Sequence, residues 1–210
     1  MKEANLREAL VMHGRSLFER GYVSGSAGNL SVRLPDGLLM TPTNSCLGRL
    51  RADRIAKLDF EGKLLCGDRP SKEAPLHLAV YRARPQDTAV VHLHSRHATA
   101  VACLADVDPA DVLPPLTPYY VMRVGRLPLV PYYPPGDAAL AQAVGAAAAD
   151  AHALLLANHG MVVSAHDLEA AVYIAEELEE AAALFLLTVA HPTRRLAPDH
   201  CEELRRRFSG

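Results

Sequence analysis

The chain has 210 residues, of which half are hydrophobic and 22% are charged, a composition typical of a globular protein with a sizeable core. Its 22 basic and 24 acidic residues give a formal net charge of −2, so we expect no nucleic-acid partner and no anionic-membrane partner. There is no apolar run of membrane-spanning length and no signal-peptide core near the start. The length fits one domain, residues 1–210, and the four cysteines, which are scattered, favour the reducing cytoplasm.

The first part of the chain predicts a helix, two hairpins and a second helix. Gly21 is a typical residue just after a helix end. Pro35-Asp36-Gly37 and Glu61-Gly62 are turn sequences between apolar runs, and Ser71 is a typical N-cap. The predicted elements are a helix at 6–18, strands at 30–34, 38–41, 57–60 and 63–66, and a helix at 72–84.

The second part alternates apolar runs with longer amphipathic segments. Residues 109–135 contain many prolines, so we expect a loop there with one brief strand. Helices that precede, separate and follow hairpin-forming strands predict a mixed sheet with helices packed on it. The predicted elements are a strand at 89–95, a helix at 97–104, strands at 127–130, 153–157 and 161–164, and helices at 136–150, 167–190 and in the basic C-terminal tail.

The strand at 89–95 carries two histidines, His92 and His94. Side chains alternate faces along a strand, so both imidazoles project from one side while Val91 and Leu93 face the other. Neutral imidazole nitrogens suit zinc and other divalent metals. For this pair alone, two hydrogen-bonded histidines with no metal remain the alternative.

His159 lies in the turn Asn158-His159-Gly160, between two strands that are apolar enough to be core. A catalytic zinc takes three protein ligands and keeps one position open. His92, His94 and His159 would supply that set. A histidine at a loop tip is more often simply exposed, so His159 alone is weak evidence for a third ligand.

Glu73 falls in the first turn of the helix predicted at 72–84. Carboxylates are common there because they interact favourably with the helix dipole. The functional alternative is a carboxylate beside the metal, which could serve as an acid or base.

Two segments, 25–29 and 41–45, are rich in glycine and in hydroxyl and amide side chains. Such residues allow close backbone approach and can surround phosphate oxygens. Together with Ser71 and Lys72 at a helix N-terminus they could form one anion pocket. Each segment by itself could equally be an ordinary turn.

Five short motifs, taken together in their order along the chain, resemble the class II aldolase/adducin family over about residues 5–190. The resemblance implies an α/β fold, an α/β/α sandwich with a central, largely antiparallel sheet. It also implies one Zn²⁺ per subunit held by His92, His94 and His159, with Glu73 as acid/base and as a fourth ligand before substrate arrives. The motifs are Gly25-Ser26-Ala27-Gly28-Asn29, Thr41-Pro42-Thr43, Ser71-Lys72-Glu73, His92-Leu93-His94 and Asn158-His159-Gly160.

The same resemblance implies a phosphorylated sugar-type substrate and a homotetramer with its sites at subunit interfaces. The residues expected to bind the substrate phosphate are Ser26, Asn29, Thr43, Asn44, Ser71 and Lys72.

Details of the motifs favour one branch of the family. Fuculose-phosphate aldolases carry Ser-Ser-Glu where this chain has Ser71-Lys72-Glu73, and ribulose-phosphate 4-epimerases carry aspartate where Glu73 stands. Residues 41–50 and 117–122 look like those of the 3-oxo-tetronate 4-phosphate decarboxylases. The resemblance therefore implies decarboxylation to dihydroxyacetone phosphate and CO₂ through a metal-bound enediolate. Glu73 would protonate it, with Tyr119 or Tyr120 of a neighbouring subunit as a helper.

Four alternatives stay open. A sugar-phosphate aldolase would pass through the same enediolate, and an epimerase or a dehydratase would use a similar site. A non-catalytic, adducin-like interaction module is the alternative from another class of protein. Such a module should have lost ligands, whereas the three histidines and Glu73 are all present.

Overall fold

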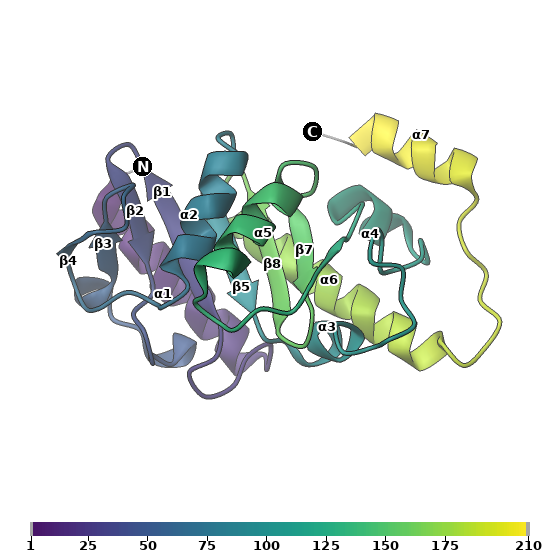
Figure 1. The fold of residues 1–210 in the computed structure, drawn as a ribbon, viewed down its shortest axis with the longest axis horizontal. Helices are drawn as coiled ribbons and strands as arrows, with labels where there is room; N and C mark the ends of the chain where they lie inside the picture. Colours follow the sequence, from purple (N-terminus) through teal and green to yellow (C-terminus); the bar gives the residue numbers. More distant parts are fainter. Residues whose placement is uncertain (1, 209–210) are drawn as a thin grey trace.

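The computed structural model describes residues 2–208, whose strands form one eight-stranded sheet with helices on both sides (Figure 1). The strands are β1 (Asn29–Leu34), β2 (Gly37–Met40), β3 (Ala56–Leu58), β4 (Leu64–Cys66), β5 (Ala89–Leu93), β6 (Leu129–Val130), β7 (Ala153–Leu156) and β8 (Gly160–Ala165). Their order across the sheet is β4-β3-β2-β1-β5-β8-β7-β6. Only the β6–β7 pair is parallel among the described strands, so the predicted largely antiparallel sheet is confirmed.

The helices form two layers around this sheet. None among residues 2–208 combines the length and the apolar character needed to cross a membrane. The α-helices are α1 (Glu3–Glu19), α2 (Ala74–Ala83), α3 (Arg96–Val101), α4 (Pro118–Arg123), α5 (Ala138–Ala148), α6 (Leu168–Thr188) and α7 (Pro198–Phe208), and two short 3₁₀ helices are η1 (Leu47–Arg49) and η2 (Ala52–Arg54).

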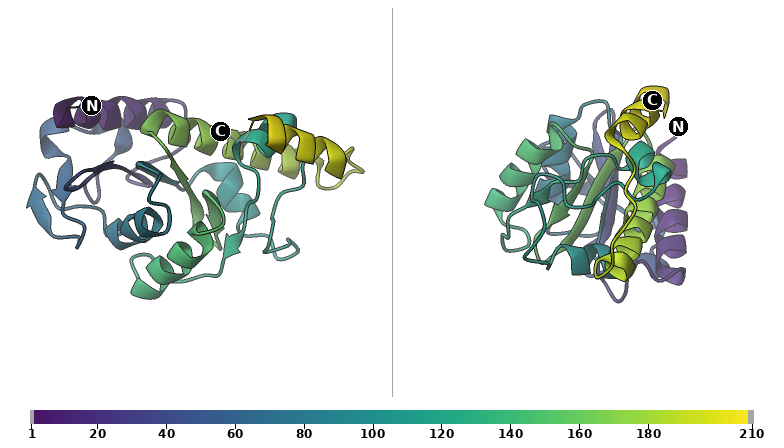
Figure 2. Two further views of the ribbon diagram at one scale, coloured as in Figure 1. Left: turned by 90° about the horizontal axis from the view of Figure 1, so that it is seen from above. Right: turned by 90° about the vertical axis from the view of Figure 1, so that its right-hand side faces the viewer.

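Helices α1 and α6 cover one face of the sheet, and α2 and α5 cover the other (Figure 2). Along a strand, successive side chains alternate between these two faces. Val91 and Leu93 of β5 join the core under α1 and α6, whereas Val90 joins the core under α2 and α5. Because both faces are covered, β5, β7 and β8 are buried along their whole length, which explains their nearly continuous apolar sequences. The predicted α/β/α arrangement is confirmed.

Two sequence predictions need correction. Ser71 is not the N-cap of α2, because the helix begins at Ala74 with Glu73 in the N-cap position. Ser71 instead accepts a hydrogen bond from the Glu73 backbone N–H at 3.2 Å and so shapes the turn before the helix. The proline-rich segment is also not only loop. It contains α4, which Thr117 caps by accepting from the Tyr120 N–H, and Pro118 takes the first helical position, where its missing N–H costs nothing.

A buried carboxylate, Glu179, ties α6 to the end of the histidine-bearing strand. It accepts hydrogen bonds from the Ser95 hydroxyl at 2.6 Å, from the His97 backbone N–H and ring at 2.9 Å each, and from the Ala98 N–H at 2.9 Å. Glu179 thus satisfies the free N–H groups at the start of α3, directly after His94. Helix starts need such acceptors because their first N–H groups have no partner within the helix.

We predict that Glu179→Gln destabilises the protein by about 1–3 kcal/mol, because an amide NH₂ group would face donors that now meet a carboxylate oxygen. Glu180→Gln is the matched control, since its side chain is exposed one position further on the same helix. Chemical denaturation of both variants measures the difference. Equal free energies of unfolding for the two variants would contradict the role given to Glu179.

Candidate functional site

The register of the three central strands places the first part of the site. In the β1–β5 pair, Asn29 lies opposite His92, and in the β5–β8 pair His92 lies opposite Val162. Both Asn29 and His92 are on the face covered by α2, where Glu73 precedes the helix. The end of β5, the start of β1 and the start of α2 therefore meet at one point.

The tip of the β7–β8 hairpin brings His159 to the same point. Asn158 there has a left-handed backbone with φ of 59°, a conformation that asparagine tolerates better than most residues. At Gly160 the backbones of the tip and of β5 touch, since a Cβ atom would lie 2.3 Å from the carbonyl oxygen of Leu93. Only glycine permits this approach, so Gly160 allows the hairpin tip to place His159 beside β5.

Four predicted side chains, Glu73, His92, His94 and His159, form one cluster. Their ligand-type atoms all lie within 4.8 Å of one another. Glu73 Oε2 is 3.3 Å from His92 Nε2, and Glu73 Oε1 is 3.2 Å from His159 Nε2. The Nε2 atoms of His92 and His94 are 3.0 Å apart.

The orientation of these groups fits a divalent cation. His92 Nδ1 is 2.7 Å from the Met161 carbonyl oxygen, so its N–H donates there and the Nε2 lone pair faces the cluster, an arrangement common in metal-binding histidines. Glu73 Oε1 and His159 Nε2 are buried, and neither makes a hydrogen bond of good geometry to the described residues. Three imidazoles and a carboxylate are a typical donor set for zinc. The four residues could therefore hold a metal ion.

The electrostatics of the cluster favour a neutral His94 and an ionised Glu73, the protonation states in which these two groups can bind a cation. Burial, followed by the neighbouring His92 and His159, lowers the pKa of His94 to about 3, so His94 is a neutral imidazole. Burial alone would raise the pKa of Glu73, but the nearby imidazoles of His92 and His159 and the hydrogen bond from Asn29 together lower it. Conversely, burial opposes a charge on His92, yet Glu73 raises its pKa. Glu73 is thus an ionised carboxylate.

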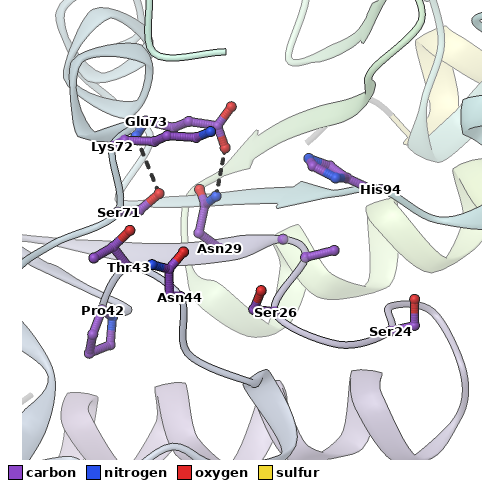
Figure 3. A pocket seen from close by; sticks show the side chains of 12 residues that line it. Ser24, Ser26, Asn29, Pro42, Thr43, Asn44, Ser71, Lys72, Glu73 and His94 are labelled. Carbon is purple, nitrogen blue, oxygen red and sulfur yellow. Dashed lines mark hydrogen bonds between the residues drawn. The ribbon is translucent and has the colours of Figure 1, made fainter.

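A hollow of about 420 Å³ adjoins the cluster, a volume suited to a small metabolite. Figure 3 shows Asn29 pointing to Glu73 within it, with His94 across the hollow. The loops at 41–43 and 69–71 lie side by side, joined by hydrogen bonds from the Ser71 N–H to the Thr41 carbonyl and from the Thr43 N–H to the Arg69 carbonyl. The lining includes every residue predicted for the anion pocket, namely Ser26, Asn29, Thr43, Asn44, Ser71 and Lys72, together with Glu73 and His94.

The chemistry of this lining suits an anion. Hydroxyl and amide groups offer neutral donors, and the exposed Lys72 offers an ammonium group. A dianionic phosphate is stabilised by such a mixture of charged and neutral donors. The ionised Glu73 belongs to both this lining and the histidine cluster.

The two tyrosines predicted as helpers do not line this hollow. Tyr120 is buried in the core and its hydroxyl makes no hydrogen bond to the described residues. Tyr119 is 60% exposed and lines a separate surface hollow together with Tyr22 and Tyr173. Help from a neighbouring subunit stays a prediction, and of the two only Tyr119 has the exposure that it requires.

One residue beside the site was not singled out from the sequence. His77, interpreted there as structural or exposed, is fully buried, with its Nε2 2.6 Å from Asn29 Oδ1. Its spacing is the signal that could have identified it, because residues four apart on a helix share a face. His77 stands one helical turn beyond Glu73, on the side that faces β1.

Comparison with known proteins yields matches over most of the chain. Residues 8–186 match the family model described as Class II Aldolase and Adducin N-terminal domain. The 3-oxo-tetronate 4-phosphate decarboxylase of Escherichia coli (strain K12) is 52% identical over 204 residues, which cover 97% of this chain and 96% of that protein.

Two further matches are a solved structure and a more distant relative. The crystal structure of YgbL from Escherichia coli, described there with three alternative activities (aldolase, epimerase or decarboxylase), is 50% identical and has a TM-score of 0.94, covering 97% of this chain and 99% of that one. The L-fuculose phosphate aldolase of Haemophilus influenzae is 33% identical, covering 89% of this chain and 84% of that protein.

The burial of His77 generates a prediction on pH. Burial lowers the pKa of His77 to about 3 from an ordinary 6.5, so between these values the unfolded chain binds a proton that the folded protein does not. The metal-free protein should therefore lose up to about 1.4 kcal/mol of stability per pH unit as pH falls from 6.5. In His77→Gln this slope should shrink by about that amount.

The matched control for this prediction is His166→Gln, at a histidine whose side chain is 76% exposed. Its slope of unfolding free energy against pH should stay near that of the wild type. Denaturation curves of the three proteins between pH 4 and pH 7 provide the measurement. An unchanged slope in His77→Gln would mean that His77 takes up its proton without unfolding.

Proposed function

This chain belongs to the class II aldolase and adducin family, and we propose that it is a metal-dependent 3-oxo-tetronate 4-phosphate decarboxylase of the cytoplasm. One observation carries the choice of reaction: the 52% identity to a decarboxylase of that name extends over nearly the whole of both chains. The intact Glu73 and histidine cluster beside an anion-binding hollow supports catalysis over a purely structural role. A fuculose-phosphate type aldolase is the second candidate, supported by the 33% identical relative.

The substrate phosphate would bind to Lys72 and to the neutral donors of the hollow. Lys72 supplies charge, while Ser26, Thr43, Asn44 and Ser71 supply hydroxyl and amide donors. This leaves the carbon chain pointing toward Glu73 and the histidines. A decarboxylase would need Lys72 to bind the phosphate and not the departing carboxylate, because a cation at that carboxylate would stabilise the ground state and raise the barrier.

His92, His94 and His159 would hold the metal, which we propose to be zinc, with Glu73 as a fourth ligand until substrate arrives. When bound, such an ion supplies Lewis-acid chemistry and stabilises negative charge on substrate oxygens. The chain itself contributes the fixed geometry. The hydrogen bond from His92 Nδ1 to the Met161 carbonyl keeps the ring in one orientation.

The reaction breaks the bond between C1 and C2 of the β-keto acid. Its electron pair stays with C2 and is shared with the C3 oxygen as an enediolate while CO₂ departs. Glu73, ionised in the resting site, would take up a proton from solvent and deliver it to C2, which gives dihydroxyacetone phosphate and returns Glu73 to the carboxylate. A retro-aldol cleavage forms the same enediolate by breaking a different bond, so an aldolase and a decarboxylase on this scaffold differ in what leaves.

The assembly belongs to the same proposal. We expect a homotetramer with sites at subunit interfaces, where Tyr119 of a neighbouring chain could approach the substrate. Its exposure supports this expectation. Light scattering of the purified protein tests the tetramer, and Tyr119→Phe tests the contribution of the hydroxyl to turnover.

The deciding experiment measures two products on one preparation. The metal-loaded protein is incubated with 3-oxo-tetronate 4-phosphates of both C2 configurations and, separately, with fuculose 1-phosphate. We expect CO₂ release to be far faster than aldehyde release. Faster aldol cleavage would favour the second candidate, and the absence of both reactions would favour a non-catalytic module.

Metal binding should depend on the hairpin tip. We predict that wild-type protein binds one divalent ion per chain and that His159→Ala loses most of it, since two imidazoles and a carboxylate hold zinc less tightly than three and a carboxylate. Elemental analysis after chelation, reloading and dialysis measures the content. His166→Ala, at an exposed histidine, is the control. Full retention of metal in His159→Ala would remove His159 from the ligand set.

Glu73→Gln should lower kcat by about 10²-fold or more, the usual scale for a lost acid–base group. Glutamine fills the same space but does not exchange protons, so the protein should stay folded and should still bind a phosphorylated product analogue. Glu61→Gln, at an exposed carboxylate in the β3–β4 turn, is the control. A Glu73→Gln protein with wild-type turnover would reduce Glu73 to a structural residue.

Lys72→Ser should raise KM for the phosphorylated substrate by about 10-fold or more, since a charged hydrogen bond contributes about 1.5–3 kcal/mol. The change makes the segment Ser-Ser-Glu, yet we expect no efficient aldol cleavage from it. Lys63→Ser, at an exposed lysine outside the hollow, is the control. An unchanged KM would place the phosphate elsewhere.

A further inference from the structure

A continuous chain of buried hydrogen bonds runs from the core to Glu73. Tyr81 Oη is 2.8 Å from Ser31 Oγ, and Ser31 Oγ is 2.7 Å from His77 Nδ1. His77 Nε2 is 2.6 Å from Asn29 Oδ1, and Asn29 Nδ2 is 2.9 Å from Glu73 Oε2. All five residues are buried.

The two backbones make this chain possible. Glu73, His77 and Tyr81 are spaced four residues apart and lie on one face of the α2 segment. Asn29 and Ser31 are two apart on β1 and project from one face of the sheet. The helix face and the strand face meet, so the five side chains alternate between them in a single line.

The hydrogen bond that Asn29 Nδ2 donates to Glu73 Oε2 sets the direction of every bond in the line. A carboxylate only accepts, so Asn29 must turn its NH₂ group to Glu73 and its carbonyl oxygen to His77. His77 must then carry its proton on Nε2 and accept on Nδ1 from the Ser31 hydroxyl, which leaves Ser31 to accept from Tyr81. A neutral imidazole offers one donor and one acceptor, as this arrangement needs, and burial keeps His77 neutral by lowering its pKa to about 3.

We infer that His77 is a positioning residue, which holds the Asn29 amide in the one orientation that donates to Glu73. The inference rests on the proposed function in that Glu73 is taken as the reacting carboxylate. Asn29 also lines the substrate hollow. If the Asn29 amide turned over, its carbonyl oxygen would face the Glu73 carboxylate and repel it. The carboxylate would then move away from the position from which it protonates substrate C2. The competing explanation is that His77 merely fills a polar space in the core.

Two substitutions at His77 separate these explanations. His77→Gln places an amide near the position of Nε2 and can still donate to Asn29. His77→Asn places an amide near the position of Nδ1 and keeps contact with Ser31, but it does not reach Asn29. Each variant loses one side of a buried contact, so we expect similar losses of thermal stability.

The activities of the two variants should differ. Removal of a side chain that orients a metal-site group typically costs about 10- to 100-fold, so we expect His77→Asn to lose this much in kcat with little change in KM, and His77→Gln to stay within a few-fold of wild type. Tyr81→Phe, which removes only the far end of the line, should cost stability and less kcat than His77→Asn. Equal losses of kcat in the Gln and Asn variants, or none in either, would overturn the inference.

A second measurement does not depend on the reaction. In metal-free protein labelled with ¹⁵N, nitrogen chemical shifts should identify His77 as a single neutral form protonated at Nε2. The Asn29 NH₂ signals, assigned by their loss in Asn29→Ala, should show one strongly hydrogen-bonded proton in wild type and His77→Gln but not in His77→Asn. A His77 protonated at Nδ1, or an Asn29 signal unaffected in His77→Asn, would refute the positioning role. If these signals behave as expected while no CO₂ is released, the proposed reaction fails and the positioning of Glu73 stands.

Discussion

The antiparallel pairing of β5 with β1 on one side and β8 on the other is the constraint on which the site depends. It sets Asn29 beside His92 and places Met161 where its carbonyl orients the His92 ring. A shift of either pair by one residue would exchange the two faces of a strand and would send polar groups into the apolar core under α1 and α6. The hydrophobic pattern of the sheet and the geometry of the cluster therefore specify the same register.

The sequence predicted the parts of the site that depend on local periodicity. Alternation in the strand placed His92 and His94 on one face, and the turn around Asn158 and Gly160 placed His159 at a hairpin tip. The two loops and Ser71 were expected to form one pocket only in combination, and tertiary hydrogen bonds between those loops are what bring them together. The roles of these residues in binding metal and phosphate remain predictions.

The errors arose where tertiary contacts override local signals. Ser71 has the composition of an N-cap, but it bonds to the Thr41 carbonyl through its N–H, and this contact delays the start of α2 to Ala74. Prolines in the segment around Thr117 suggested a loop, although proline is well tolerated at a helix start. The spacing of His77 from Glu73 places both on one helix face, but its partners Asn29 and Ser31 come from a distant strand, so the sequence did not indicate its contacts.

The contact between His92 and the Met161 carbonyl joins residues 69 positions apart, and this separation bears on how the protein folds. The hairpins and helices need only short loop closures, whereas β8 must return across the intervening segments to reach β5, a step of high contact order that is intrinsically slow. During synthesis β5 leaves the ribosome before β8. The edge of β5 that pairs with β8, together with His92 and His94, therefore has no partner strand until β8 has been made. His159 arrives with that strand, and the cluster of Glu73 and the three histidines is complete only when the centre of the sheet has closed.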